Sequence, residues 1–367
     1  MTVSINGTSG IVFNDASTQN TAATGFGFKN RIINGAMVID QRNAGASVTN
    51  TAAYVFGVDR WKAYGSQASK FTMQQNAGSV TPPVGFTNYL GITSSSAYSV
   101  GATEQFFVTQ LIEGYNIADL GWGTANAKTI TVSFQVYSSL TGTFGGTISN
   151  SGGSRNYPFS YTVSSANTWT TITISVSGDT SGTWLTTNGI GIFLQFNLGM
   201  GSTYSGTAGA WTASAIFGPT GATSVVGTNG ATFYITGVQL EKGSTATSFD
   251  YRPYTTELQL CQRYLPAITL TGSNAICSAY NTATTTSVGI FHFLVTPRTP
   301  PTGITATAAS GFAFSSAANF TASAIAFADA SPVAGKFTLT ISGGTAGQGG
   351  YIYGSNGAQI LFTGCEL

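Results

Sequence analysis

The stretch Thr129-Ile130-Thr131-Val132-Ser133-Phe134-Gln135-Val136-Tyr137 alternates polar and apolar side chains. Successive side chains of a strand point to opposite faces of a sheet, so this alternation predicts a strand with one buried face and one face in water. The same period of two recurs at residues 170–176, 191–196 and 232–240. Glycine-rich turns such as Ser151-Gly152-Gly153 separate these stretches. The sequence therefore predicts an all-β protein built on a large antiparallel β-sandwich of the jelly-roll kind.

One segment, residues 254–265, has the period of a helix instead. The side chains that share one face of this helix are Tyr254, Leu258, Cys261 and Leu265. Thr255 or Thr256 is the expected N-cap, and Pro266 is expected to end the helix. The sequence thus predicts one short helix between the large sandwich and a smaller C-terminal β region.

Composition divides the chain into three blocks. Residues 1–27 are rich in Gly, Thr and Asn and are too few to bury a core alone, so we expect them to be either disordered or ordered only by neighbours. Residues 28–255 hold every tryptophan and the main sandwich. Residues 256–367 hold the short helix and a C-terminal β domain, with strands expected at 288–295, 337–341 and 359–362. The proline-rich segment 296–301 should interrupt strand pairing, because proline has no N–H to donate.

Charge is scarce in this chain. It has 13 basic and 12 acidic residues, or 7% charged, whereas about one quarter of an average protein is charged. The net charge of +1 and the lack of a basic stripe argue against nucleic acid as a partner. No apolar run approaches the roughly 18 residues of a membrane span, and the opening residues lack the pattern of a signal peptide. We therefore expect synthesis in a cytoplasm without export or membrane insertion.

Few residues offer acid–base or metal chemistry. His292 is the single histidine and alternates with Phe291 and Phe293, as an exposed residue of a strand would. Cysteines Cys261, Cys277 and Cys365 have no CxxC spacing, which argues against zinc and against a disulfide framework. The acids that could form a glycosidase pair are Asp40, Asp59, Glu104, Glu113, Asp119 and Asp250.

Three of these acids have a basic residue close in sequence. The pairs Asp40–Arg42, Asp59–Arg60 and Asp250–Arg252 are better explained as structural ion pairs, because a buried charge is costly unless it is paired. We therefore predict a protein that is not an enzyme and that holds no cofactor.

Several motifs resemble a known family. The segment Ile5–Gln19, INGTSGIVFNDASTQ, is similar to the INGTxGIxFxDGSTQ opening of many tail-fibre and virion-appendage proteins of tailed phages, with Ala16 in place of the usual glycine. Further motifs that look like this family follow in order: NRIINGAM at 30–37, DRW at 59–61, DLGW at 119–122, GVQLEKG at 237–243, FDYRP at 249–253, CQRY at 261–264 and the ending CEL. The resemblance spans essentially the whole chain.

The resemblance implies a structural virion protein with a jelly roll like that of carbohydrate-binding modules. Phage appendages are commonly threefold, so a homotrimer is expected, attached to other virion proteins through residues 1–27. The apolar side chains expected to meet in the trimer are Ile5, Ile11, Val12 and Phe13. A structural calcium ion would follow from the likeness to carbohydrate-binding modules, although the sequence has no dense aspartate cluster like an EF-hand loop.

Sugar binding needs a flat aromatic ring with polar groups around it. The candidate rings are Trp61, Tyr64, Trp184 and Tyr204, with Asn76, Asn188 and Asn197 as polar neighbours. For Trp61 and Trp184 the competing interpretation, packing in the core, has the stronger claim. The tryptophans expected to close the ends of the sandwich are Trp122, Trp169 and Trp211.

The sequence therefore favours a tail-fibre or spike subunit of a phage virion that contacts host-surface glycans. Three alternatives stay open. The first is a head-decoration or head-fibre protein with the same fold, the second a glycan depolymerase, and the third a free carbohydrate-binding module. The last of these is disfavoured because the sequence shows no export signal.

Overall fold

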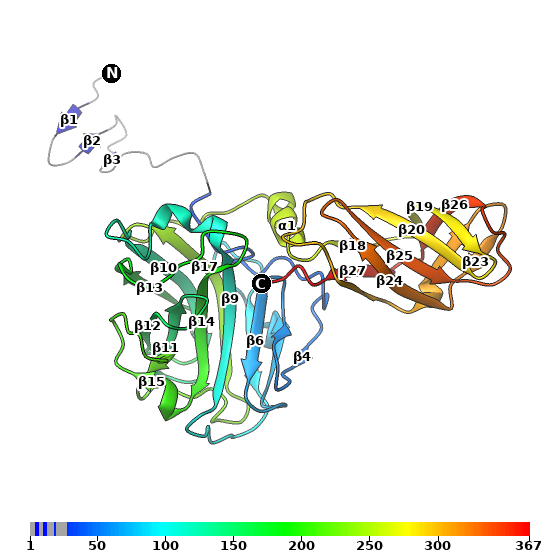
Figure 1. Cartoon of the computed structure of the whole chain (residues 1–367). Coiled ribbons are helices and arrows are strands. Elements are labelled where there is room, and N and C mark those ends of the chain that lie inside the picture. Colours follow the sequence, from blue (N-terminus) through cyan, green and yellow to red (C-terminus); the bar gives the residue numbers. More distant parts are fainter. Residues whose placement is uncertain (1–3, 7–9, 13–17, 20–27) are drawn as a thin grey trace.

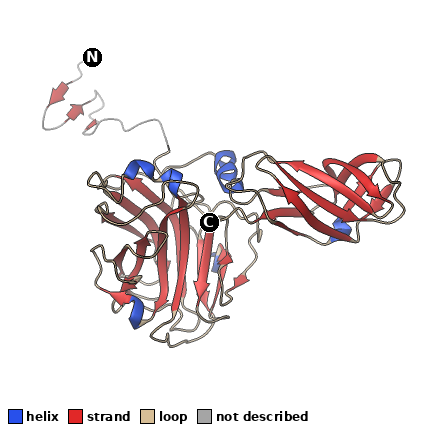
Figure 2. Cartoon of the chain, in the orientation of Figure 1, coloured by secondary structure: helices blue, strands red, loops and turns tan. Residues whose placement is uncertain are grey.

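A computed structural model of the chain describes residues 4–6, 10–12, 18–19 and 28–367. Strands β1 (Ser4–Asn6), β2 (Gly10–Val12) and β3 (Thr18–Gln19) form a small antiparallel sheet. From residue 28 onward the chain is dominated by strands (Figure 2). Among the described residues, no helix is long and apolar enough to cross a membrane.

Two six-stranded antiparallel sheets form the sandwich (Figure 1). The first sheet runs in the order β13 (Thr170–Val176), β10 (Ile130–Ser138), β17 (Thr232–Lys242), β8 (Leu90–Ser94), β7 (Phe71–Gln75) and β4 (Val48–Thr49). The second runs in the order β12 (Asn156–Val163), β11 (Gly142–Ser149), β14 (Ile190–Met200), β9 (Gln105–Glu113), β6 (Trp61–Gly65) and β5 (Val55–Phe56). The predicted all-β class and the sandwich are thus confirmed, with the alternating stretches at β10, β13, β14 and β17.

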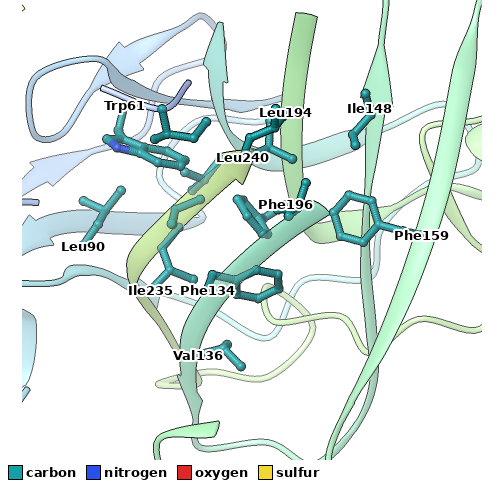
Figure 3. Close-up of a cluster of buried hydrophobic side chains, with 14 of the residues drawn as sticks. Trp61, Leu90, Phe134, Val136, Ile148, Phe159, Leu194, Phe196, Ile235 and Leu240 are labelled. Carbon is teal, nitrogen blue, oxygen red and sulfur yellow. The ribbon is translucent and has the colours of Figure 1, made fainter. Parts of the chain in front are cut away.

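The core between the sheets consists of the inward half of each strand. In β10, Val132, Phe134 and Val136 are fully or almost fully buried, as their period of two predicts. Phe134 meets Phe196 of β14 from the opposite sheet, with ring centroids 4.9 Å apart, and Trp61 packs beside them (Figure 3). These large rings contribute most of the apolar area removed from water, which drives folding at roughly 25 cal/mol per Å².

Strand β17 carries one irregularity with a clear cause. Opposite Phe134, the pairing with β10 shifts by one residue, and Gly237 lies at a φ of 61°. This left-handed conformation favours glycine, which marks a β-bulge. A side chain at Gly237 would also collide with the ring of Phe86, because an added Cβ would lie 2.6 Å from Cζ. Both the positive φ and the close approach of Phe86 therefore require glycine at the first position of the motif at 237–243.

Short connections complete the sandwich. Brief 3-10 turns are η1 (Ala77–Ser79), η2 (Gly114–Asn116), η3 (Ala118–Leu120), η4 (Ser202–Tyr204) and η5 (Ala309–Gly311), the last in the C-terminal region. Strands β15 (Ser205–Gly206) and β16 (Gly218–Pro219) pair in parallel over the second sheet.

The predicted helix is present as α1 (Tyr254–Gln262), and two of its details were wrong. The N-cap is Pro253, with no side-chain cap, because the helix begins at Tyr254 and so places Thr255 and Thr256 inside its first turn. Tyr254 is 62% exposed and does not share the buried face. That face instead contains Cys261 and the charged Glu257, which packs against the sandwich.

The C-terminal region has its own sheets and core. Strands β18 (Ala267–Thr269), β27 (Gln359–Thr363) and β21 (Gly303–Ala306) form one sheet. A curled seven-stranded sheet has the order β23 (Asn319–Thr321), β22 (Phe312–Ser315), β26 (Gly349–Gly354), β19 (Asn274–Ala283), β20 (Thr286–His292), β25 (Ala334–Thr340) and β24 (Ala324–Ala330). The strand expected at 288–295 ends at His292, and the proline-rich segment 296–301 lies outside the strands as predicted. This region projects to one side of the sandwich, and the C-terminus returns beside β6 (Figure 1).

Charged side chains gather where the two regions meet. The carboxylate of Glu366 pairs with Arg42 at 2.7 Å and with Arg60 at 2.6 Å. After the helix, Arg263 forms a two-point pair with Glu113 of β9, at 2.9 and 2.6 Å. We call these five residues the junction cluster. These ion pairs bind the C-terminal residues and the segment after α1 to the sandwich.

The three ion pairs expected from sequence neighbours were wrong. Asp40 accepts hydrogen bonds from the backbone of Asn43 and Gly45, and Asp59 accepts them from Gln41. Asp250 accepts hydrogen bonds from the backbone N–H groups of Lys29 and Asn30. The arginines bind elsewhere: Arg42 and Arg60 bind Glu366, and Arg252 binds Glu257. All three acids accept hydrogen bonds from backbone N–H groups, while the three arginines pair with other carboxylates.

Candidate functional site

The outer face of the second sheet carries polar and aromatic side chains that the core does not use. In β14, Ile192, Leu194 and Phe196 point into the core, so Phe193 and Gln195 point outward. Neighbouring strands place further residues on this face, namely Tyr64 of β6, Phe107 and Thr109 of β9, and Thr147 and Ser149 of β11. The sheet thus carries mixed aromatic and neutral polar side chains on its outer side, and most of them are covered: Thr109 and Thr147 are fully buried, and Phe107 and Gln195 are each 5% exposed.

A pocket of about 240 Å³ lies over this face. We call it the outer groove. Its lining residues are Tyr54, Ser149, Asn150, Ser151, Gly152, Gly153, Phe193, Gln195 and Phe217. None of these side chains is ionisable near neutral pH, because the phenol of tyrosine titrates near pH 10. The groove can therefore offer ring faces and neutral hydrogen-bonding groups to a ligand.

Three aromatic rings cluster beside the outer groove. The centroid of Tyr54 lies 5.4 Å from that of Tyr64 and 6.2 Å from that of Phe107, and the Tyr64 and Phe107 centroids are 5.5 Å apart. Tyr54 is 45% exposed, so part of it is accessible to a ligand. The Nζ of Lys62 lies 4.4 Å from the ring centroid of Tyr54, within the range of a cation–π contact. The same Nζ donates a hydrogen bond to the backbone carbonyl of Leu367 at 2.8 Å.

A covering loop, residues 201–219, crosses the same face. It includes η4, β15 and β16. Tyr204 packs against Phe217 in a tilted arrangement with centroids 5.7 Å apart, and Phe217 in turn lines the outer groove. The side chain of Asn197 in β14 donates to the carbonyl of Phe217 at 3.1 Å. The covering loop is therefore tied to the sheet at the point where it borders the groove.

Gln195 lines the outer groove, is 5% exposed, and keeps part of its hydrogen-bonding capacity unused. Its Nε2 donates to Oδ1 of Asn197 at 3.1 Å, which uses one of its two N–H groups. Within residues 28–367, its Oε1 accepts no hydrogen bond. In contrast, Asn150 is saturated: its Oδ1 accepts from two backbone N–H groups, and its Nδ2 donates to Ser154 and Thr183.

Two of the four candidate sugar platforms, Trp61 and Trp184, are buried, as the competing interpretation of core packing predicted. Trp61 is fully buried in the core, where its Nε1 donates to the carbonyl of Asn34 at 3.0 Å. Trp184 is buried among other tryptophans. Tyr64 and Tyr204 are half-buried and lie beside the outer groove, on the β6 side and on the covering loop.

The three asparagines expected beside the sugar-binding rings lie in different parts of the structure. Of the predicted polar neighbours, Asn197 supports the covering loop, whereas Asn76 binds the backbone of Tyr89. The carbonyl of Asn188 accepts from Arg298. Sequence reasoning missed Tyr54, Phe193, Gln195 and Phe217. The phase of residues 191–196 contained the signal for Phe193 and Gln195, since both alternate with the core residues of β14.

Three tryptophans close one end of the sandwich. The centroids of Trp122, Trp184 and Trp211 lie 4.6 to 5.5 Å apart in edge-to-face contacts. Beside them, Arg155 forms a two-point pair with Asp179, both contacts at 2.7 Å. This cluster matches the expectation that Trp122 and Trp211 pack at a sandwich end. Trp169 is instead half-exposed and packs on Tyr89 and Tyr137.

The six acids considered for catalysis are held by structural contacts, and none lines the outer groove. Besides the three already described, Glu104 accepts from Tyr98, Glu113 binds Arg263 and Tyr264, and Asp119 pairs with Arg31 and Lys242. His292 is exposed on β20, as its phase predicted. In the part of the chain that the structure describes, no three His, Cys, Asp or Glu residues gather as a metal site would require.

The expected trimer contacts are not described by the structure. Phe13 lies outside the described residues. For Ile5, Ile11 and Val12 only the strand pairing is described, with Ile5 opposite Ile11 in β1 and β2. The three cysteines are free, and Cys261 and Cys365 are buried.

Comparison with known proteins returned structural similarities alone. No family profile and no curated protein matches the sequence. The enzymatically active domain of tailspike protein 4 of bacteriophage CBA120 covers 58% of this chain at 10% identity and a TM-score of 0.31, and the match spans 21% of that chain. A CBM4 structure covers 50% at 13% identity and a TM-score of 0.28, with 95% of its own length matched. The family 11 carbohydrate-binding module of a cellulosomal cellulase from Clostridium thermocellum covers 56% at 11% identity and a TM-score of 0.27, with 98% of its own length matched.

Proposed function

We propose that this chain is a non-enzymatic structural protein of a tailed-phage virion, a tail-fibre or spike subunit that binds host-surface glycans in the outer groove. The lining of the outer groove is the observation that supports glycan binding. It combines the exposed ring of Tyr54 and the half-buried rings of Phe193 and Phe217 with the amide of Gln195, which is 5% exposed, and none of its lining groups ionises near neutral pH. Sugars have apolar ring faces and many hydroxyl groups, so rings that stack and amides that both donate and accept suit them.

The virion part of the proposal depends on the sequence. The motifs shared with phage appendages run from residue 5 to residue 367. The contacts of the six candidate acids support a role without catalysis, since each acid already stabilises the fold. A homotrimer formed through residues 1–27 would place three grooves on one particle component, and weak single sites would then gain from avidity.

Glycan binding is tested with two matched variants of the full chain. Gln195→Ala removes the available amide, and Gln135→Ala changes the same residue type on the outer face of the opposite sheet. On an oligosaccharide array, we expect binding by the wild type and by Gln135→Ala, and a loss of at least tenfold for Gln195→Ala. Equal binding by all three proteins would exclude the outer groove as the site.

Location and assembly need separate measurements. Gold-labelled antibody against this chain should mark phage tails in electron micrographs, whereas label on the heads would support the head-decoration alternative. Light scattering should give three times the mass of one chain, and a monomer would contradict the trimer. Incubation with host polysaccharide should leave chain lengths unchanged, because shortening would reveal a depolymerase.

A further inference from the structure

One lysine lies between the outer groove and the C-terminal residues. In β6, Trp61 and Ala63 belong to the core of the sandwich. Side chains alternate along a strand, so Lys62 and Tyr64 point to the outer face of the second sheet. Lys62 is 8% exposed, which is unusual for a lysine. A buried ammonium group is costly unless it has partners, so the groups around Nζ keep Lys62 in this position.

Lys62 has partners on two sides. Toward the outer groove, its Nζ lies 4.4 Å from the ring centroid of Tyr54 and 5.9 Å from that of Phe56. Toward the C-terminal residues, the same Nζ donates to the backbone carbonyl of Leu367 at 2.8 Å. An ammonium group has three donors and no acceptor, so one carbonyl and two aromatic rings together stabilise its charge.

The C-terminal segment, residues 365–367, is held by contacts outside the outer groove. Within the junction cluster, Glu366 pairs with two arginines at 2.7 and 2.6 Å. From the C-terminal region, Arg298 donates to the backbone carbonyls of Cys365 at 2.8 Å and of Glu366 at 2.6 Å. These contacts determine where the carbonyl bound by Lys62 lies.

Tyr54 has few contacts that would hold its ring without Lys62. It immediately precedes β5, at the end of residues 51–54, which are all exposed. Its other ring contacts are with Tyr64 and Phe107, whose centroids lie 5.4 and 6.2 Å away. Loss of the contact with Lys62 should therefore change where the ring of Tyr54 lies, while the sheet beneath it keeps its fold.

We infer that the C-terminal segment controls the position of Tyr54 in the outer groove through Lys62, so that glycan affinity depends on the binding of this segment to the sandwich. Lys62 is a positioning residue, because it contacts Tyr54 and Tyr54 lines the groove. The inference rests on the proposed function, since it concerns regulation of the same site. Such coupling is reciprocal, so a glycan that holds Tyr54 in place also stabilises the bound C-terminal segment.

The coupling gives the outer groove a dependence on alkaline pH. Burial lowers the pKa of Lys62 from 10.5 to about 8, the nearby carboxylate of Glu366 raises it, and the charge of Arg60 lowers it. Above that pH, Lys62 loses its charge and with it the attraction to the ring of Tyr54. Burial and the neighbouring Tyr64 raise the pKa of Tyr54 from 10.0, so Tyr54 itself stays neutral there. Glycan affinity should therefore fall as the pH rises through about 8.

The first test compares the affinities of full-chain variants for an oligosaccharide selected on the array. Lys62→Met keeps an unbranched side chain and removes the charge, so we expect roughly fivefold weaker binding and loss of the pH dependence. Lys70→Met is the matched control, because Nζ of Lys70 lies 4.5 Å from the ring centroid of Tyr98 and neither residue lines the outer groove. This control should bind as the wild type does.

The second test acts on the C-terminal segment from a distance. Arg298→Ala removes two hydrogen bonds to residues 365–367 and changes no residue of the groove lining. We expect it to weaken glycan binding roughly fivefold. In the reverse direction, the oligosaccharide should slow amide hydrogen exchange in the peptide that contains residues 365–367. This protection should be absent in Lys62→Met.

The outcomes separate the inference from the proposed function. Unchanged affinity in Lys62→Met and Arg298→Ala, with binding still lost in Gln195→Ala, would overturn the inference and leave glycan binding in place. Equal weakening in Lys70→Met would also overturn it. If Lys62→Met does not fold, a wild-type affinity that stays constant through pH 8 decides against the inference. If the wild type is folded by circular dichroism and binds no glycan on the array, both the inference and the proposed function are wrong.

Discussion

The carboxylate of Glu366 lies 2.6 Å from the guanidinium of Arg60, although the two residues are separated by 306 positions in the sequence. Arg60 packs flat over the ring of Tyr264, with its Cζ 3.5 Å from the ring centroid. Arg298 donates to the backbone carbonyl of Glu366 at 2.6 Å. One acidic residue near the C-terminus thereby joins the sandwich, the end of α1 and the C-terminal region.

Glu366→Gln should destabilise the protein. The side chain of Arg60 is 3% exposed, and removal of a buried partner leaves an uncompensated charge that costs about 3–5 kcal/mol. The measurement is the midpoint of urea unfolding, followed by tryptophan fluorescence. Asp329→Asn is the matched control, because its pair with Lys336 is 66% exposed on the acid side and should contribute less than about 1 kcal/mol. Equal midpoints for Glu366→Gln and the wild type would show that the pair adds no net stability.

Glu113 should make stability depend on acid pH. Burial by itself would raise the pKa of Glu113, but hydrogen bonds from Arg263 and Tyr264 hold the pKa below its ordinary value of 4.5. A lowered folded-state pKa gives stability that is present above the ordinary value and is lost as the pH falls through the folded value. Glu113→Gln should therefore be less stable than the wild type at neutral pH, and the difference should shrink in acid. Thermal unfolding across the pH range measures this, and a constant difference would contradict it.

Asp59 should make the stability of the fold change with pH in the opposite direction to Glu113. Burial raises its pKa from 3.8 to about 7, against the hydrogen bond from Gln41 and the charge of Arg42. The folded state then binds a proton more tightly than the unfolded state, so this contribution is fully present below pH 3.8 and is lost as the pH rises through about 7. In Asp59→Asn, that decline between the two pH values should disappear. Urea titrations at several pH values check it, and an unchanged slope would mean that Asp59 is ionised throughout.

The distant ion pairs could not have been predicted from the sequence. Asp59 and Arg60 lie in a turn, where Arg60 has a φ of 71°; Asp59 binds Gln41, whereas Arg60 binds Glu366. The partner of Arg60 depends on how the C-terminal region folds back, and no local pattern in the sequence encodes this. In contrast, the strands follow from alternation alone, because the period of two in Val132, Phe134 and Val136 already specifies which face is buried.

Part of the outer groove could be predicted from the sequence, because alternation along a strand also specifies which side chains share a face. Trp61 and Tyr64 are three positions apart in one strand, so they must lie on opposite faces, and only one of them can face the solvent. The sequence does not say which, since both are large aromatics. Tyr54 and Phe217 lie outside the alternating strands, and only the folded chain brings them to the outer groove.

Trp184→Ala and Tyr54→Ala should separate stability from binding. Trp184 is buried against Trp122 and Trp211, and loss of a buried tryptophan side chain costs about 3–5 kcal/mol. Tyr54 is half-exposed at the groove, so its loss should change the unfolding free energy by less than about 1 kcal/mol. Calorimetric titration with an array-selected oligosaccharide should show roughly tenfold weaker binding for Tyr54→Ala, which is about 1.4 kcal/mol, and unchanged affinity for folded Trp184→Ala. If Trp184→Ala lost affinity while folded and Tyr54→Ala kept it, the ligand would bind at the tryptophan end of the sandwich instead of the outer groove.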